Sequence, residues 1–100
     1  MLSLMPIEIS QTASGGAWSF NTERFTGVDL RQIIIKAAAD DTTFDFSITD
    51  EKSNIVYVAE GNTGTLNDLL YLPMRGIYTI AVANSSVVDS VYTGRMMMEA

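Results

Sequence analysis

Apolar and polar residues alternate strictly through residues 43–49, which restricts this part of the chain to an extended strand. Phe44, Phe46 and Ile48 share one parity, and the positions between them are threonine, aspartate and serine. Such a strand buries one face in a core and leaves the other in water. A polar turn at 50–54 follows, after which β-branched and aromatic residues resume, so the two segments predict an antiparallel hairpin.

Similar segments recur at regular spacing, with short turns between them and no strong helical pattern. Seven strands are expected, within residues 7–9, 18–21, 28–37, 43–49, 55–59, 76–83 and 91–98. Residues 66–74 place leucines at helical spacing before a proline, and we expect an irregular crossover there. The pattern predicts one all-β domain spanning residues 1–100, an antiparallel β-sandwich or a small barrel. The long crossover favours a sandwich with jelly-roll-like connectivity.

The third of these segments changes phase along its length. Val28 and Leu30 share one parity, whereas Ile33 and Ile35 share the other. A β-bulge at 31–32 would bring both pairs onto one face of the strand, because a bulge adds one residue without a partner opposite it.

The chain contains neither cysteine nor histidine. It therefore has no disulfide and no thiol nucleophile, and it lacks the commonest general base, the Ser-His-Asp arrangement and nearly all common zinc chemistry. We expect neither an enzyme nor a bound cofactor. The 100 residues, 47% of them hydrophobic, suit one modest core.

Acidic residues outnumber basic ones by 12 to 6, which gives a net charge of -6. The basic residues are spread along the chain, so no patch attracts phosphate and nucleic-acid binding is not expected. A partner with a basic surface fits better. The apolar runs are too short to cross a bilayer, and the first residues do not form a secretory signal, so we expect neither membrane insertion nor export by a cleaved leader.

Two acidic pairs, at 40–41 and 50–51, stand where strands end. Carboxylates gathered in sandwich loops can bind calcium through oxygen ligands. Aspartate is also common in turns because its side chain hydrogen-bonds the backbone, and we adopt this interpretation, with no metal site. Asp45 and Asp50 could form a carboxylate pair for glycosidic hydrolysis, but no pattern places them across a cleft.

Aromatic side chains could form a different site, because exposed rings can stack on sugars. The candidates are Trp18, Tyr57, Tyr71, Tyr78 and Tyr92. Tyr57, Tyr78 and Tyr92 lie in apolar strands, which favours positions in or near the core. The single tryptophan could do either, and a core position is the more common one in a domain of this size.

Two runs break the alternation: residues 33–35 are three isoleucines and residues 96–98 are three methionines. Both faces of each strand are therefore apolar. A two-layer domain of this size has no further layer to cover the outer face, and a partner chain is the simplest cover. The alternative is that the termini or the 66–74 crossover cover these residues within one chain.

The first residues are also largely apolar and are expected to form a short N-terminal arm (1–5), ordered against a neighbour or against its own domain. The residues that we predict to contact partners are Leu2, Leu4, Met5, Ile33, Ile35, Val87 and Met97. No catalytic, cofactor-binding or metal-binding residue is predicted.

The stretch Pro73-Met-Arg-Gly-Ile-Tyr-Thr-Ile-Ala-Val-Ala-Asn84, followed by Asp89-Ser-Val-Tyr-Thr-Gly-Arg-Met-Met-Met98, resembles small jelly-roll modules and short virion proteins of tailed bacteriophages, including capsid decoration (cement) proteins. Decoration proteins are small, acidic or neutral, cysteine-poor β domains that lie on capsid lattices, often as trimers, and strengthen the shell. The resemblance implies a virion protein assembled in the host cytoplasm. It also implies homo-oligomers and other virion proteins as partners, the major capsid protein first among them. It assigns no role to any individual residue.

Three functions are compatible with these observations. The first is a non-enzymatic structural protein on a phage capsid. The second is another position in the virion, in the neck, the tail or the fibre attachment, which the copy number per particle would distinguish from the first. The third is a carbohydrate-binding module, which titration with a panel of glycans, with and without calcium, would reveal.

Overall fold

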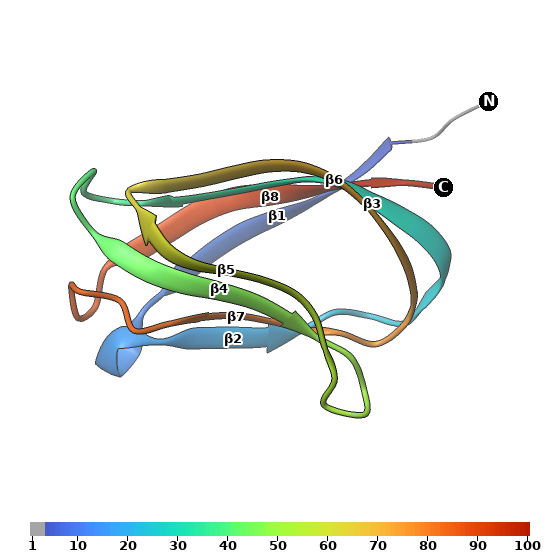
Figure 1. Cartoon of the computed structure of the whole chain (residues 1–100), viewed down its shortest axis with the longest axis horizontal. Coiled ribbons are helices and arrows are strands. Elements are labelled where there is room, and N and C mark those ends of the chain that lie inside the picture. The colour runs from blue at the N-terminus through green and yellow to red at the C-terminus, as the bar shows by residue number, and fades with distance from the viewer. Residues whose placement is uncertain (1–3) are drawn as a thin grey trace.

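The computed structural model describes residues 4–100, with side chains from Pro6 onward, as two four-stranded antiparallel sheets packed face to face (Figure 1). The strands are β1 (Leu4–Thr12), β2 (Trp18–Asn21), β3 (Phe25–Ala37), β4 (Thr43–Thr49), β5 (Ile55–Thr63), β6 (Thr65–Gly76), β7 (Thr79–Ala83) and β8 (Val91–Glu99). A single 3-10 turn, η1 (Ser14–Gly16), joins β1 to β2. In the part of the chain that the structure describes, no helix has the length and apolar character needed to cross a membrane.

Strand pairing is nested around the tip of one long hairpin. Counted from the two ends of the chain, β1 pairs with β8, β2 with β7, β3 with β6 and β4 with β5. The hairpin is rolled up, so that β8 also pairs with β3 and β7 with β4. The two sheets have the orders β1-β8-β3-β6 and β2-β7-β4-β5, which together form a jelly roll. The predicted fold class is confirmed, with eight strands in place of about seven.

The predicted hairpin at the tip is confirmed, and its turn is held by one aspartate. Phe44, Phe46 and Ile48 of β4 are buried, and the residues between them are not. In the turn, Asp50 Oδ1 accepts hydrogen bonds from the backbone N–H groups of Lys52 and Asn54, both at 2.9 Å. The acidic pair at 50–51 thus begins with a turn-forming residue, as its sequence position suggested.

The expected irregular crossover at 66–74 is wrong, because these residues belong to the strand β6. Its core side carries Leu66, Leu70, Leu72 and Met74 in strict alternation, but the polar Asp68 interrupts this row and Leu69 lies on the outer face, which gave the leucines their apparent helical spacing. Leu66 and Met74 are buried on the core side of the strand, whereas Leu69 is exposed. Pro73 is compatible with this strand because β6 lies at the edge of its sheet, where one side needs no ladder hydrogen bonds.

The predicted bulge in β3 is confirmed. The register of β3 against both β6 and β8 shifts between Leu30 and Gln32. As a result Val28 and Leu30 on one side of the shift, and Ile33 and Ile35 on the other, are all buried in the same core.

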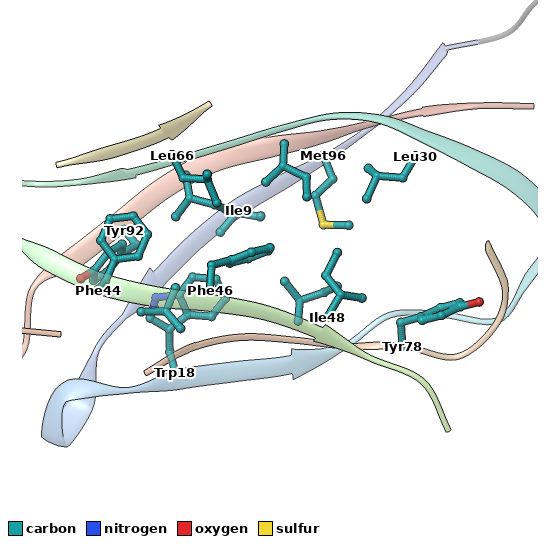
Figure 2. Packing of buried hydrophobic residues seen from close by; sticks show 14 of the residues in the cluster. Ile9, Trp18, Leu30, Phe44, Phe46, Ile48, Leu66, Tyr78, Tyr92 and Met96 are labelled. Carbon is teal, nitrogen blue, oxygen red and sulfur yellow. The ribbon is translucent and has the colours of Figure 1, made fainter. Parts of the chain in front are cut away.

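Aromatic rings fill the core near one end of the sandwich (Figure 2). The ring of Tyr92 lies edge-on to Phe44, with centroids 5.2 Å apart, and 6.1 Å from the ring of Trp18. The Tyr92 hydroxyl reaches the loop above it, 2.7 Å from Ser85 Oγ. The single tryptophan is therefore a core residue, 6% exposed.

The backbone of β1 pairs with β8 from Leu4 opposite Glu99 to Thr12 opposite Val91. Two residues assigned to the expected arm (1–5), Leu4 and Met5, thus contribute backbone to β1. Leu2 lies outside the described residues.

Candidate interaction surface

The prediction that Ile33 and Ile35 contact a partner is wrong. Both are fully buried in the core of their own chain, at 0% exposure, and cannot reach a partner in this fold. The cause is the bulge in β3, which places Ile33 and Ile35 on the core side of the strand. Of the three isoleucines, the one on the outer face is Ile34, and it is half-buried.

Met97 lies on the outer face of the first sheet, because its neighbours Met96 and Met98 point into the core. The strand register places it in one outward row, with Pro6 on one side and Gln32 and Leu69 on the other. This row crosses all four strands of the sheet. Its apolar members lie on the side of the sheet that the sandwich leaves uncovered.

A shallow groove of about 330 Å³ runs along the β6 side of this row. Its residues are Arg31, Gln32, Leu69, Leu70, Met97 and Glu99. Leu69 is 79% exposed and nearby Tyr71 63%, so neither contributes much to the core.

Arg31, the extra residue of the β3 bulge, fixes one wall of the groove. Its guanidinium lies 3.2 Å from Glu99 Oε1 and 5.4 Å from the centroid of the Tyr71 ring. The ion pair and the cation–π contact together orient Tyr71 and leave the apolar side chain of Leu69 free.

A second candidate surface lies at the end of the sandwich shown on the left in Figure 1, where four connections meet. Ser85 of the β7–β8 loop donates its N–H to Gly16 O of η1 at 2.9 Å, and Ser86 donates to Thr43 O at 2.9 Å. Gly64 of the β5–β6 turn donates to Thr42 O at 2.7 Å. Backbone hydrogen bonds therefore hold this end together, and the β7–β8 loop has a defined position on it.

The β7–β8 loop exposes valines on this end. Val87, one of the predicted contact residues, is 42% exposed, and Val88 is 62% exposed. Val91, at the start of β8, is also exposed. These side chains add little to the core, so their apolar surface is available to a partner.

The same end is strongly acidic. Residues 13–17, 38–45, 59–64 and 84–90 contain five of the twelve acidic residues of the chain, and the basic residue beside them is Lys36, next to last in β3 and opposite Thr65. The five are Asp40, Asp41, Asp45, Glu60 and Asp89. Asp45 accepts hydrogen bonds from Asn84 Nδ2 and the Gly61 N–H, both at 2.8 Å, and these hold the pKa of its carboxyl below the ordinary value. We call this end, with its exposed valines, the acidic end.

The structure also places the other candidate groups. Asp45 and Asp50 lie near opposite ends of β4, about 16 Å apart along an extended strand, farther than the roughly 5–10 Å at which paired carboxylates act on a glycosidic bond. Among the described residues, no group of three or more His, Cys, Asp or Glu side chains is arranged to hold a metal ion. Tyr78 and Tyr92 are buried, and Tyr57 is half-buried.

Sequence reasoning missed most of the exposed apolar residues. Leu69 lay in the segment taken for a crossover, and Val88 lay in a loop with no alternation to read. Tyr71 lay in the same segment as Leu69 but had been named as a ring that could stack on a sugar, and it is exposed. Ile34 could have been found, because the predicted bulge already implied its outward direction.

The fold and the exposed surfaces define a small jelly-roll domain with apolar side chains presented on an outer sheet face and at one end. No family model matches the chain, and no curated protein matches it. The solved structures with a similar chain path include three from one virus. A chain in the structure of the infectious bursal disease virus Gx strain matches with a TM-score of 0.44 at 10% sequence identity, over 100% of this chain and 32% of that one. The Gt strain gives 0.44 at 12% identity, over 99% and 32%. The VP2 subviral particle of the same virus gives 0.43 at 12% identity, over 98% and 32%.

The chain thus spans about a third of the length of the viral proteins to which it is compared. TM-scores below 0.5 at such low identity do not establish a relationship.

Proposed function

We propose that this chain is a non-enzymatic structural protein of a virus particle, and specifically a decoration protein of a tailed-bacteriophage capsid. It would strengthen the shell through contacts with the major capsid protein. The observation that carries the proposal is the acidic end, where an ordered loop exposes valines that its own core does not need. Such a surface suits protein–protein contact, because apolar side chains supply burial and the surrounding carboxylates select a basic partner.

Two further observations support the virion context. The strand order is that of the jelly roll, an architecture that recurs in viral capsid and lectin domains. The residues that resemble phage virion proteins, 73–84 and 89–98, include β7 and all of β8 except Glu99, and they flank the loop that carries Val87 and Val88. The fold is an analogy, and the proposed function therefore depends on the surface.

Binding to capsids lacking the protein tests this proposal. Heads are prepared from a phage mutant in which the gene for this chain is deleted, mixed with the purified chain, and sedimented. We expect saturable binding across the shell and greater resistance of the heads to heat. A few copies per particle would instead indicate the neck, the tail or the fibre attachment, and absence of binding would contradict a virion role.

A matched pair of variants locates the contact. Val88→Ser removes an apolar side chain of the acidic end that is 62% exposed, and Ile55→Ser removes one, 66% exposed, beside the hairpin turn at the other end. Both positions are too exposed to matter much for stability. We expect Val88→Ser to weaken capsid binding and Ile55→Ser to leave it unchanged, whereas equal affinities would exclude the acidic end as the contact.

A carbohydrate-binding role is the second candidate, and Tyr71 is the observation that favours it. Its ring is exposed beside the groove, and the amide side chains of Gln32 and Asn67 lie next to that groove, joined by a hydrogen bond of 3.1 Å. An exposed ring with adjacent amides is a common arrangement for sugar recognition. Calorimetric titration with a glycan panel, with Tyr71→Ala as control, tests it, and no heat from any glycan would eliminate it.

A further inference from the structure

The four edge strands of the sandwich differ in how well they are protected against pairing with another chain. The edges are β1 and β6 in one sheet and β2 and β5 in the other. Short strands, register breaks and prolines all discourage edge-to-edge pairing. β2 has only four residues, β5 is broken twice in its register against β4, and β6 contains a register shift and Pro73. By contrast, β1 pairs with β8 without a break over nine residues, and its proline, Pro6, lies near the start of the strand, so residues 7–12 carry neither a register break nor a proline.

The direction of the backbone groups along β1 follows from hydrogen bonds at its end. Ala13 donates its N–H to Ser90 O at 2.8 Å, toward β8. Backbone groups alternate sides along a strand, so Ile9 and Gln11 also face β8. The N–H and C=O groups of Ser10 and Thr12 must therefore point away from it.

A second, independent bond gives the same assignment. Ala37 donates its N–H to Gly64 O at 2.9 Å, on the β6 side of β3, so Lys36 bonds to β8 at Thr93. The adjacent residue of β8, Gly94, must then bond to β1 at Ile9.

From Glu8 onward the outward groups of β1 belong to Glu8, Ser10 and Thr12, whose side chains are all exposed, whereas Pro6 faces the same way but has no N–H to donate. Within residues 4–100, no strand pairs with β1 on this side. A regular row of free donors and acceptors is a template for one more strand.

We propose that two copies of this chain associate through β1, whose free edges pair antiparallel about a two-fold axis and join the two β1-containing sheets into one continuous sheet. The strand is compatible with its own copy. With Ser10 at the axis, Glu8 lies opposite Thr12 of the partner copy and Pro6 is left outside the paired segment. With Ile9 at the axis, Glu8 lies opposite Ser10, but Thr12 lies opposite Pro6, which has no N–H, so this register makes fewer hydrogen bonds. In both registers each Glu8 faces a hydroxyl, and within its own chain Glu8 neighbours Arg95 on β8. A register centred on Glu8 is excluded by like charges.

Charge sets the expected salt dependence of this association. Each copy carries a net charge of -6, so two copies repel each other at low ionic strength. Added salt screens this repulsion and leaves the backbone hydrogen bonds in place. We therefore expect association to strengthen with salt, unlike an interface made by ion pairs. This proposal does not depend on the proposed capsid role.

Two proline variants test the proposal on the full chain. Ser10→Pro removes an outward N–H of β1 and leaves the ladder to β8 intact. Ser19→Pro is the matched control: Thr22 donates its N–H to Tyr78 O at 2.8 Å on the β7 side, so by alternation the Ser19 N–H faces the free side of β2. Sedimentation equilibrium in low and high salt measures association, and circular dichroism verifies folding.

We expect the wild type to form a concentration-dependent dimer and Ser19→Pro to associate equally well. Ser10→Pro should associate at least about tenfold more weakly, because the two-fold axis removes the hydrogen bond of this N–H twice per dimer. A wild type that stays monomeric in both salts, or equal effects of the two prolines, would overturn the proposal. If Ser10→Pro does not fold, amide exchange of the wild type decides. The N–H groups of Ser10 and Thr12 should exchange more slowly as concentration rises, and rates that do not depend on concentration would refute pairing through β1.

Discussion

The triple isoleucine of β3 provides a direct test of the strand phase on which the core and the outer surface depend. Ile33 and Ile35 are fully buried on one side of the strand, and Ile34, between them, is half-buried on the other. We expect Ile33→Ala and Ile35→Ala to destabilise the protein strongly and Ile34→Ala to do so weakly. The three changes are chemically identical, so differences among them report only the direction of each side chain.

The magnitude follows from the atoms removed. Isoleucine to alanine deletes three carbons, worth about 0.8 kcal/mol each on transfer from water to the core, and the cavity left behind raises the cost to about 2–5 kcal/mol. Ile34 is only partly buried and lies on the outer face, so its truncation leaves no cavity in the core, and the loss of β-propensity and partial burial should cost about 1 kcal/mol. For a domain of this size the core changes should lower the melting temperature by about 10–30 °C.

Urea unfolding followed by the fluorescence of Trp18 measures these free energies, because this buried ring reports on the core. The slope of the free energy against urea concentration should match the wild type in all three variants, which shows that only stability changed. Equal losses at Ile33 and Ile34 would refute the bulge and the burial assignment that follows from it.

Three other predictions concern the packing and the charged groups. Gly94→Ala should cost about 3 kcal/mol or more, or prevent folding, because a Cβ at this position would overlap the Ile34 carbonyl oxygen; the yield of folded protein and urea unfolding measure it. Tyr57→Phe should cost about 0.5–1.5 kcal/mol by urea unfolding, because it removes the hydrogen bond that the Tyr57 hydroxyl donates to Asp68 across the β5 and β6 edges. Acid should destabilise the fold: hydrogen bonds, first from the Asn54 N–H, hold the pKa of Asp50 below its ordinary 3.8. A carboxyl whose pKa is lowered by folding stabilises the fold above pH 3.8, and this contribution is lost as the pH falls through the folded-state pKa. The urea concentration at the unfolding midpoint should therefore decrease when the pH is lowered below about 4, and it should decrease less steeply in Asp50→Asn.

Alternation alone was sufficient to predict the fold class, because a half-buried antiparallel strand alternates buried apolar residues with exposed polar ones, and this pattern is visible in the sequence. The β4–β5 hairpin and the bulge in β3 were both visible in this way. β6 was not visible, because the polar Asp68 stands in its core-facing row, the apolar Leu69 stands on its outer face, and Pro73 argues against a central strand. Whether Pro73 is tolerated depends on whether the strand lies at an edge, and that is decided by pairing with a distant segment.

The contact surface was harder to predict than the core. An apolar run shows that both faces of a strand are apolar, but it does not show which face is inside. The predicted bulge shows which face is inside, because it places Ile33 and Ile35 on the same side of the strand as Val28 and Leu30. The same bulge would have assigned Ile34 to the outer face. Val88 left no comparable signal, because its exposure depends on how the loops pack at the acidic end.

One extra residue in β3 shapes both the inside and the outside of this domain. Without it, the apolar residues before and after position 31 would face opposite sides of the sheet, and the core would lose one of the two groups. With it, Arg31 projects outward, where it contacts both Glu99 and Tyr71 and forms a wall of the groove. The irregularity that keeps the core continuous is therefore also what gives the outer face a shaped surface, and a bulge-free strand would have left that face flat.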